Sequence, residues 1–231
     1  MSHLILHHYW PSPFAHKIRL AFAWAEISWQ SVEIPRIPPK PLLFPLTAGY
    51  RRTPVLQHGA DIFCDTQNIA RYLGETYALD ALFPEGCLDR ALIFSSWLDR
   101  IVFPLCVRVV LTLSINKVSS DFIQDRAGLY FGSSWNPERL ETELPGVLHQ
   151  LATEFHAIDR AIGSGDALMS KSCSYADIAI AYIAWFLRGR WEGGPHFLTA
   201  FPNIERIERV IHEKNEEHYD SLSAEEALKI A

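Results

Sequence analysis

The stretch Thr53–Thr66, which reads TPVLQHGADIFCDT, decides the fold of this chain. It contains two short strand patterns, Pro54–His58 and Asp61–Cys64, joined by a turn that contains glycine, so it predicts a β-hairpin. Pro54 opens the first strand, although a proline cannot donate a hydrogen bond to a sheet ladder. A cis peptide bond before Pro54 is the physical way to keep the proline at that position.

The two ends of this stretch predict a binding site. The cis bend would turn the edge of Val55 outward, so that its N–H and C=O groups are open to an extended peptide that adds as a strand. Asp65 and Thr66 follow the second strand and open a helix, whose free N–H groups favour a carboxylate. Taken singly, a Thr–Pro pair is typical of a turn and an Asp–Thr pair is typical of a helix cap. The order and spacing of the two pairs favour the site.

The segments around the hairpin predict an α/β unit with a mixed sheet. Leu4–His8 and Trp29–Ile34 read as strands, and Ser12–Pro13 starts a helix with Ser as the N-cap and Pro at the first position. The segment Pro35–Pro45 is too rich in proline to form a regular helix. We therefore expect a first domain over residues 1–79.

Beyond a linker-like segment at Leu79–Gly86 the chain becomes helical, so we expect an all-helical domain over residues 87–231. Leu88–Leu113 and Pro137–Ile162 show amphipathic helical patterns. Ser174–Asp177 resembles a capping box and precedes an almost wholly apolar segment. This pattern predicts a buried central helix.

Composition excludes several classes of function. The net charge of −6 over 231 residues, with no Lys/Arg block interleaved with aromatic residues, argues against nucleic acid as a partner. The apolar run Ile101–Leu113 is too short to span a bilayer, so we expect no membrane segment. The four cysteines form no C-x-x-C motif, which favours a reducing cytosol over a zinc site or a disulfide framework. His7 and His8 point to opposite faces of a strand, so we expect no metal site there.

Four motifs follow one another in a specific order along the chain: Ser12–Ala15 (SPFA), Thr53–Val55 (TPV), Asp65–Thr66 followed by Ile69 and Tyr72–Leu73, and Ser174–Ile178 (SYADI). Together with the two-domain organisation, they resemble the cytosolic glutathione transferases over essentially the whole chain. The resemblance implies a thioredoxin-like mixed-sheet N-terminal domain followed by a helical bundle domain. It also implies glutathione as co-substrate and a cytoplasmic homodimer that serves detoxification. The SPFA stretch is closest to the Cys–Pro–Phe–Ala of the omega class, with Ser in place of Cys.

The resemblance also assigns roles to residues of the first domain. The Val55 backbone would pair with the cysteinyl backbone of glutathione. Thr66 would bind the γ-glutamyl carboxylate through its hydroxyl and amide, with Asp65 near the ammonium group. Arg52 and Lys40 would lie near the glycyl carboxylate.

Ser12 falls at the catalytic position that the resemblance implies. Lowering a thiol pKa by about two units needs ~2.7 kcal/mol. A hydroxyl hydrogen bond to a charged group supplies about 1.5–3 kcal/mol, and a helix N-terminus adds ~0.3–1 kcal/mol. We therefore expect Ser12 to stabilise the thiolate, in preference to Tyr9, because the helix assists only Ser12. A Ser hydroxyl cannot form the mixed disulfide that the omega-class Cys forms.

The second substrate is expected to be a small hydrophobic electrophile bound between the domains. The candidate wall consists of Phe14, Phe103, Val107 and Trp185, although large apolar residues at helical spacing are also typical of a core. Two alternatives stay open. One is a glutathione-dependent lyase, isomerase or reductase at the same site, and the other is a non-catalytic module that binds glutathione or another ligand.

Overall fold

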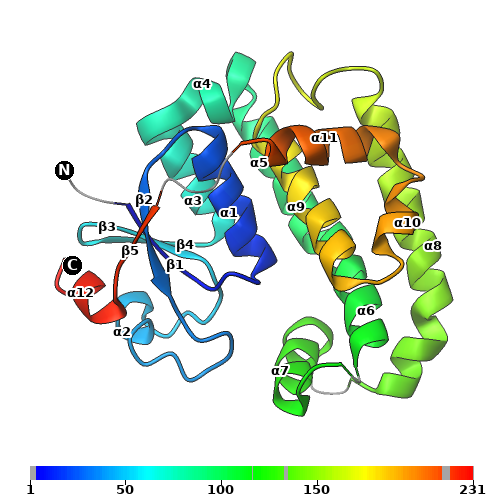
Figure 1. The fold of residues 1–231 in the computed structure, drawn as a ribbon, viewed down its shortest axis with the longest axis horizontal. Helices are drawn as coiled ribbons and strands as arrows, with labels where there is room; N and C mark the ends of the chain where they lie inside the picture. The colour runs from blue at the N-terminus through cyan, green and yellow to red at the C-terminus, as the bar shows by residue number, and fades with distance from the viewer. Residues whose placement is uncertain (1–3, 116, 133–134, 215–218, 231) are drawn as a thin grey trace.

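The computed structural model describes residues 4–115, 117–132, 135–214 and 219–230, with a mixed sheet at one end and a helical bundle at the other (Figure 1). The strands are β1 (Leu4–His8), β2 (Trp29–Glu33), β3 (Val55–His58), β4 (Asp61–Cys64) and β5 (Tyr219–Ser221). They lie in the order β4-β3-β1-β2-β5, with β1 parallel to β2 and antiparallel to β3. The predicted mixed sheet followed by helices is confirmed.

The helices are α1 (Pro13–Trp24), α2 (Phe44–Thr47), α3 (Thr66–Leu73), α4 (Leu79–Leu82), α5 (Leu88–Trp97), α6 (Phe103–Ser114), α7 (Ser120–Phe131), α8 (Pro137–Ile162), α9 (Tyr175–Arg190), α10 (Gly194–Leu198), α11 (Pro202–His212) and α12 (Ala224–Ala227). Two π-helical segments, η1 (Gly74–Ala78) and η3 (Leu98–Val102), and a 3₁₀ turn, η2 (Pro84–Gly86), lie between them. No helix within the described ranges is both long and apolar enough to cross a membrane.

The predicted helix Leu88–Leu113 is divided into α5, η3 and α6. Pro104 lies in the first turn of α6 and has no N–H to continue the α-helical ladder, which explains why the change of helix type falls there. Pro145 does not end α8, which continues through it. The segment expected to be a linker, Leu79–Gly86, forms α4 and η2.

Strand β1 lies at the centre of the sheet and is buried along its whole length. Leu4 and Leu6 belong to the large core that includes residues of α1 and α3, whereas Ile5 belongs to a second cluster with Val32 and Ala227. Because both faces of the sheet are covered, the first part of β1 reads as a continuous apolar run rather than as an alternating pattern.

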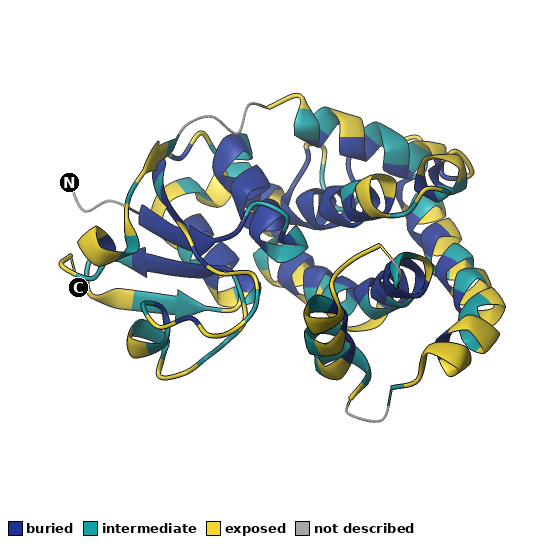
Figure 2. Ribbon diagram, turned by 60° about the horizontal axis from the view of Figure 1, so that its bottom comes forward, coloured by how far each residue is buried: buried dark blue, intermediate teal, exposed yellow. Residues whose placement is uncertain are grey.

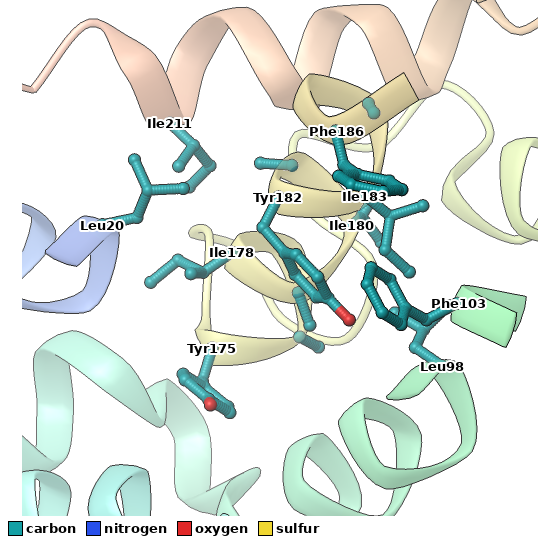
Figure 3. Close-up of a cluster of buried hydrophobic side chains, with 14 of the residues drawn as sticks. Leu20, Leu98, Phe103, Tyr175, Ile178, Ile180, Tyr182, Ile183, Phe186 and Ile211 are labelled. Carbon is teal, nitrogen blue, oxygen red and sulfur yellow. The ribbon is translucent and has the colours of Figure 1, made fainter. Parts of the chain in front are cut away.

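Helix α9 forms the buried centre of the bundle (Figure 2). The predicted capping box is confirmed: Asp177 accepts the backbone N–H of Ser174 at 2.8 Å, and Ser174 Oγ accepts the N–H of Ala176 at 3.2 Å. Figure 3 shows Tyr182 of α9 beside Phe103 of α6, with ring centroids 5.9 Å apart. Helix α9 also packs on α1, so it connects the bundle to the sheet.

The expectation that residues 87–231 are all helical is wrong at Tyr219–Ser221, which form β5 and pair in parallel with β2. Helix α12 follows and is fixed to the sheet by Gln57, whose side chain donates to the Ala227 carbonyl at 3.0 Å. Strand β5 covers the outer edge of β2, an edge that would otherwise present unpaired backbone groups. The last described part of the chain therefore completes the sheet domain.

Candidate active site

A cavity of about 520 Å³ lies between the sheet domain and the bundle. Its lining comes from the start of α1, the segment before β3, the start of α3, η3, and helices α6, α7 and α9. Within the described ranges this lining includes most of the predicted site residues: Ser12, Lys40, Arg52, Asp65, Thr66, Phe14, Phe103 and Val107. Val55 and Trp185 do not belong to it.

Ser12 lies at the N-terminus of α1 and is only 2% exposed. Its Oγ accepts the N–H of Ala15 at 3.2 Å, so it is the N-cap that the sequence predicts. A hydroxyl carries one proton and two lone pairs. Within the described ranges that proton has no protein acceptor, and it remains available to a ligand in the cavity.

The peptide bond between Thr53 and Pro54 is cis, as predicted, and a second cis bond joins Pro38 and Pro39. The open edge expected at Val55 is absent. Val55 is fully buried and pairs with His7 of β1 on one side and with Cys64 of β4 on the other. Because β3 is an interior strand, its neighbours occupy the space that a peptide would need.

Thr53, on the other side of the cis bond, takes the position that Val55 was expected to have. It precedes β3 and lines the cavity. Among the described residues no hydrogen bond is made by its backbone N–H or C=O, whereas its hydroxyl accepts from Lys40 at 2.9 Å. The backbone groups open to an extended peptide are therefore those of Thr53.

The start of α3 carries the predicted Asp65–Thr66 pair. Asp65 is the N-cap, with a φ of 75° and its Oδ1 accepting the Gln67 N–H at 2.8 Å. Thr66 is 5% exposed, and its Oγ1 lies 3.5 Å from Asp99 Oδ2. The Gln67 amide nitrogen donates to Asp99 at 3.2 Å, but its Oε1 is buried without a partner among the described residues. An unpaired buried acceptor beside two carboxylates fits a cationic group.

Asp99 of η3 connects three helices at the floor of the cavity. Its carboxylate accepts from Lys17 of α1 at 2.5 Å and from the Tyr182 hydroxyl of α9 at 2.6 Å, in addition to Gln67 of α3. Lys17 is fully buried, and burial lowers its pKa while the Asp99 carboxylate opposes that shift. Sequence reasoning missed this group, although a lysine among the apolar residues of α1 was a signal for a buried partner.

Lys40 lies at the Thr53 end of the cavity and is 3% exposed. Its ammonium donates to Thr53 Oγ1 at 2.9 Å and to the Arg51 carbonyl at 3.2 Å. Burial, followed by the charges of Arg126 and Arg51, lowers the pKa of Lys40 to about 8. Tyr9 also lines this end, and its hydroxyl accepts from Arg126 at 2.9 Å.

The opposite half of the cavity is apolar. Phe14 and Phe103 are in edge contact at 4.8 Å between ring centroids, and Phe186 lies 5.2 Å from Phe103. Trp185, expected in this wall, instead stacks on His16 with centroids 4.0 Å apart. One residue along a helix is a rotation of about 100°, so Phe186 takes the cavity position and Trp185 faces α1.

Comparisons with known proteins identify the family of this fold. Residues 6–81 match the family model described as "Glutathione S-transferase, N-terminal domain". A GST-like protein from Pseudomonas syringae is 32% identical, with the alignment covering 100% of this chain and 74% of that chain and a TM-score of 0.72. The chain belongs to the glutathione S-transferase family.

Curated relatives of this glutathione S-transferase family member occur in Nicotiana tabacum. One, named "Probable glutathione S-transferase", is 27% identical over 209 residues, which is 89% of this chain and 82% of the relative. Another, named "Probable glutathione S-transferase parA", is 25% identical over 111 residues, so the match spans 50% of its length. The thioredoxin-like N-terminal domain and the helical bundle expected from the sequence are those of the family.

Proposed function

We propose that this protein is a glutathione transferase that activates the thiol of glutathione with Ser12 and transfers the thiolate to a small hydrophobic electrophile. The observation that carries the proposal is one cavity lined jointly by the Ser12 hydroxyl, by Thr53 beside the cis bond, and by the Asp65–Thr66 start of α3. These groups match the sulfur, the backbone and the γ-glutamyl end of one extended tripeptide.

The γ-glutamyl end would lie at the start of α3. The free N–H groups of the first helical turn and the Thr66 hydroxyl would hold its carboxylate. Asp65, the unpaired Oε1 of Gln67 and Asp99 would receive its ammonium group, which gives that buried acceptor a donor. The Thr53 backbone would pair with the cysteinyl residue, in the role first expected of Val55.

The glycyl carboxylate would lie near Lys40 and Arg52, which line the Thr53 end of the cavity. Arg52 has no carboxylate within ion-pair distance among the described residues. An anion beside Lys40 would favour its charged form and raise the pKa that burial lowers.

Ser12 would act as the hydrogen-bond donor to the thiolate and not as a nucleophile. Donation to a charged acceptor contributes about 1.5–3 kcal/mol, and the α1 N-terminus adds ~0.3–1 kcal/mol. Tyr9 remains the second candidate donor: its hydroxyl accepts from Arg126 at 2.9 Å, and Ser12 is preferred because it lies at the N-terminus of α1. The electrophile would lie against Phe14, Phe103 and Val107.

We further propose that the protein acts as a cytoplasmic homodimer. The four cysteines, Cys64, Cys87, Cys106 and Cys173, are all unpaired, as expected of a reducing compartment. Ile93 and Ile101 are 71% and 47% exposed. Large apolar side chains this exposed favour burial against a second copy.

Calorimetry with glutathione, combined with turnover of a panel of aryl halides and activated alkenes, tests the proposal. We expect saturable binding of one glutathione per chain and turnover of at least one electrophile. Absence of glutathione binding would overturn the proposal. Binding without turnover on the whole panel would favour the non-catalytic module.

A further inference from the structure

The lining of the cavity carries more positive charge than glutathione uses. Seven of its ionisable side chains are Lys or Arg, and two are Asp. Asp125 pairs with both Arg51 and Arg126, at 2.7 and 2.8 Å. Arg36 and Arg190 have no carboxylate within ion-pair distance in the described part of the chain.

Arg36 and Arg190 are exposed residues of the lining, and their contacts with described residues include no carboxylate. The Arg36 guanidinium lies over the Phe122 ring at 4.8 Å, and its backbone carbonyl accepts from Arg126 at 2.7 Å. The Arg190 guanidinium lies over the Trp185 ring at 5.3 Å and donates to the Pro11 carbonyl at 3.3 Å. Stacking on an aromatic face positions a guanidinium but does not neutralise it.

Both guanidinium groups belong to the lining of the same cavity. Burial and the nearby Arg36 charge lower the pKa of Arg190. Like charges that share a site repel, and an anion placed between them converts that repulsion into two attractions. Guanidinium groups bind carboxylates and related oxyanions with two parallel hydrogen bonds, which gives such an anion a defined orientation.

Arg190 lies apart from the residues proposed to hold the glutathione carboxylates, whereas Arg36 lies beside Arg126, which contacts Tyr9 at the Lys40 end of the cavity. Pro11, which accepts from Arg190, directly precedes Ser12, so Arg190 lies at the sulfur end of the cavity. The two carboxylates of glutathione are accounted for by the start of α3 and by Lys40 with Arg52. The charge of Arg36 and Arg190 is therefore left for the second substrate.

We propose that the electrophile carries an anionic group, a carboxylate or sulfonate, on an aromatic body, and that Arg36 and Arg190 hold that group while Phe103 and Phe186 contact the ring. This inference rests on the proposed function and names its substrate class. The reacting carbon then lies between the arginine pair and the Ser12-bound sulfur.

A matched pair of aryl chlorides tests the inference: 4-chloro-3,5-dinitrobenzoate and its methyl ester, which differ in charge. In both reactions the thiolate sulfur forms a bond to the carbon at position 4. The carbon–chlorine bond breaks, chloride leaves with the bonding pair, and the thiol proton passes to solvent. The carboxylate or ester is unchanged, so the ratio of kcat/KM for acid over ester reports binding of the charge.

The variants are Arg36→Gln and Arg190→Gln, with Arg160→Gln as the control. Arg160 lies exposed on α8, outside the cavity lining, so its replacement changes the net charge equally. We expect the wild-type protein to prefer the acid, and each cavity variant to lower the acid-to-ester ratio by about tenfold, the loss of one charged hydrogen bond. Arg160→Gln should leave the ratio unchanged.

Two results would overturn the inference: a wild-type ratio at or below one, or a ratio that the cavity variants do not change, including the case in which they raise only the KM for glutathione. If neither chloride reacts, a binding experiment gives the same comparison. Tryptophan fluorescence then measures the affinities of 3,5-dinitrobenzoate and of its methyl ester for the protein loaded with S-methylglutathione. There an acid preference that falls in both cavity variants supports the inference, and equal affinities overturn it. Absence of glutathione binding to the wild-type protein in calorimetry would instead count against the proposed function.

Discussion

Replacing Ser12 with alanine should raise the pKa of the bound glutathione thiol by about one to two units. Ser12 is 2% exposed, so water does little to compensate for the loss of its hydroxyl. A donor to a charged acceptor is worth about 1.5–3 kcal/mol, and each pKa unit corresponds to about 1.4 kcal/mol. The α1 N-terminus remains in the variant, so the thiol should keep part of its activation.

The thiolate absorbance of the glutathione complex, titrated with pH, measures this shift. Ser12→Ala also removes an N-cap, which costs about 1 kcal/mol of folding free energy. Ser223→Ala is the matched control, because Ser223 Oγ caps α12 by accepting from Glu226 N at 3.2 Å, the distance found between Ser12 and Ala15. The control should lose a cap without changing the thiol pKa. An identical thiol pKa in Ser12→Ala and wild type would refute the reasoning and make Tyr9→Phe the next variant to measure.

Four further predictions address binding, pH and assembly. Asp65→Asn keeps the cap of α3 but removes the charge, so calorimetry should find glutathione binding weaker by about tenfold. Equal affinity would show that Asp65 does not bind the ammonium group of glutathione. The charge of Lys40 is lost as the pH rises through about 8, so the affinity for S-methylglutathione should fall by up to about tenfold between pH 7 and 9. Lys40→Arg should abolish that decline. The same decline in the wild type and in Lys40→Arg would assign it to another group. Burial and the nearby Arg19 charge lower the pKa of His16 to about 2, so His16 stays neutral in the folded state while the unfolded chain takes up a proton below about pH 6.5. The free energy of unfolding should therefore fall by ~1.4 kcal/mol per pH unit from this group as the pH drops from 6 to 4. Urea unfolding of His16→Gln should show a pH dependence of that free energy that is flatter by this amount, and an unchanged pH dependence would contradict the assignment. If the protein is the proposed homodimer, Ile93→Asp should convert it to a monomer in sedimentation experiments. A variant that sediments as the wild type does would exclude this face from the dimer contact.

The features that the sequence predicts well are those decided by neighbouring residues. The Ser12 cap, the cis bond at Pro54 and the capping box at Ser174–Asp177 each depend on a few consecutive residues with strong local preferences. Such local preferences do not depend on the rest of the fold, so they can be predicted from the sequence.

Two errors at the site come from orientation that local pattern does not determine. The choice between Val55 and Thr53 depends on β3 being an interior strand, and that follows from the order of the whole sheet. The choice between Trp185 and Phe186 depends on the rotation of α9, which is apolar on nearly every side and so gives no polar face to set its phase.

The charged groups of the site come from distant parts of the chain. Asp99 and Lys17 are 82 residues apart, and Arg36 and Arg190 come from a loop and from the end of a helix. No periodicity or spacing connects such residues before the fold is known. Strand β5 was not predicted for a similar reason, since Tyr219–Ser221 is three residues long, mostly exposed and paired with a strand far upstream.

Strand β5 has a consequence for biosynthesis. The other four strands lie within residues 4–64, but the sheet is complete only when residues 219–221 have left the ribosome. Throughout translation of the bundle, the outer edge of β2 presents unpaired amide and carbonyl groups that other nascent chains can bind. A fragment that stops after residue 79 would keep those groups unpaired permanently, and it should therefore aggregate more readily than the full chain.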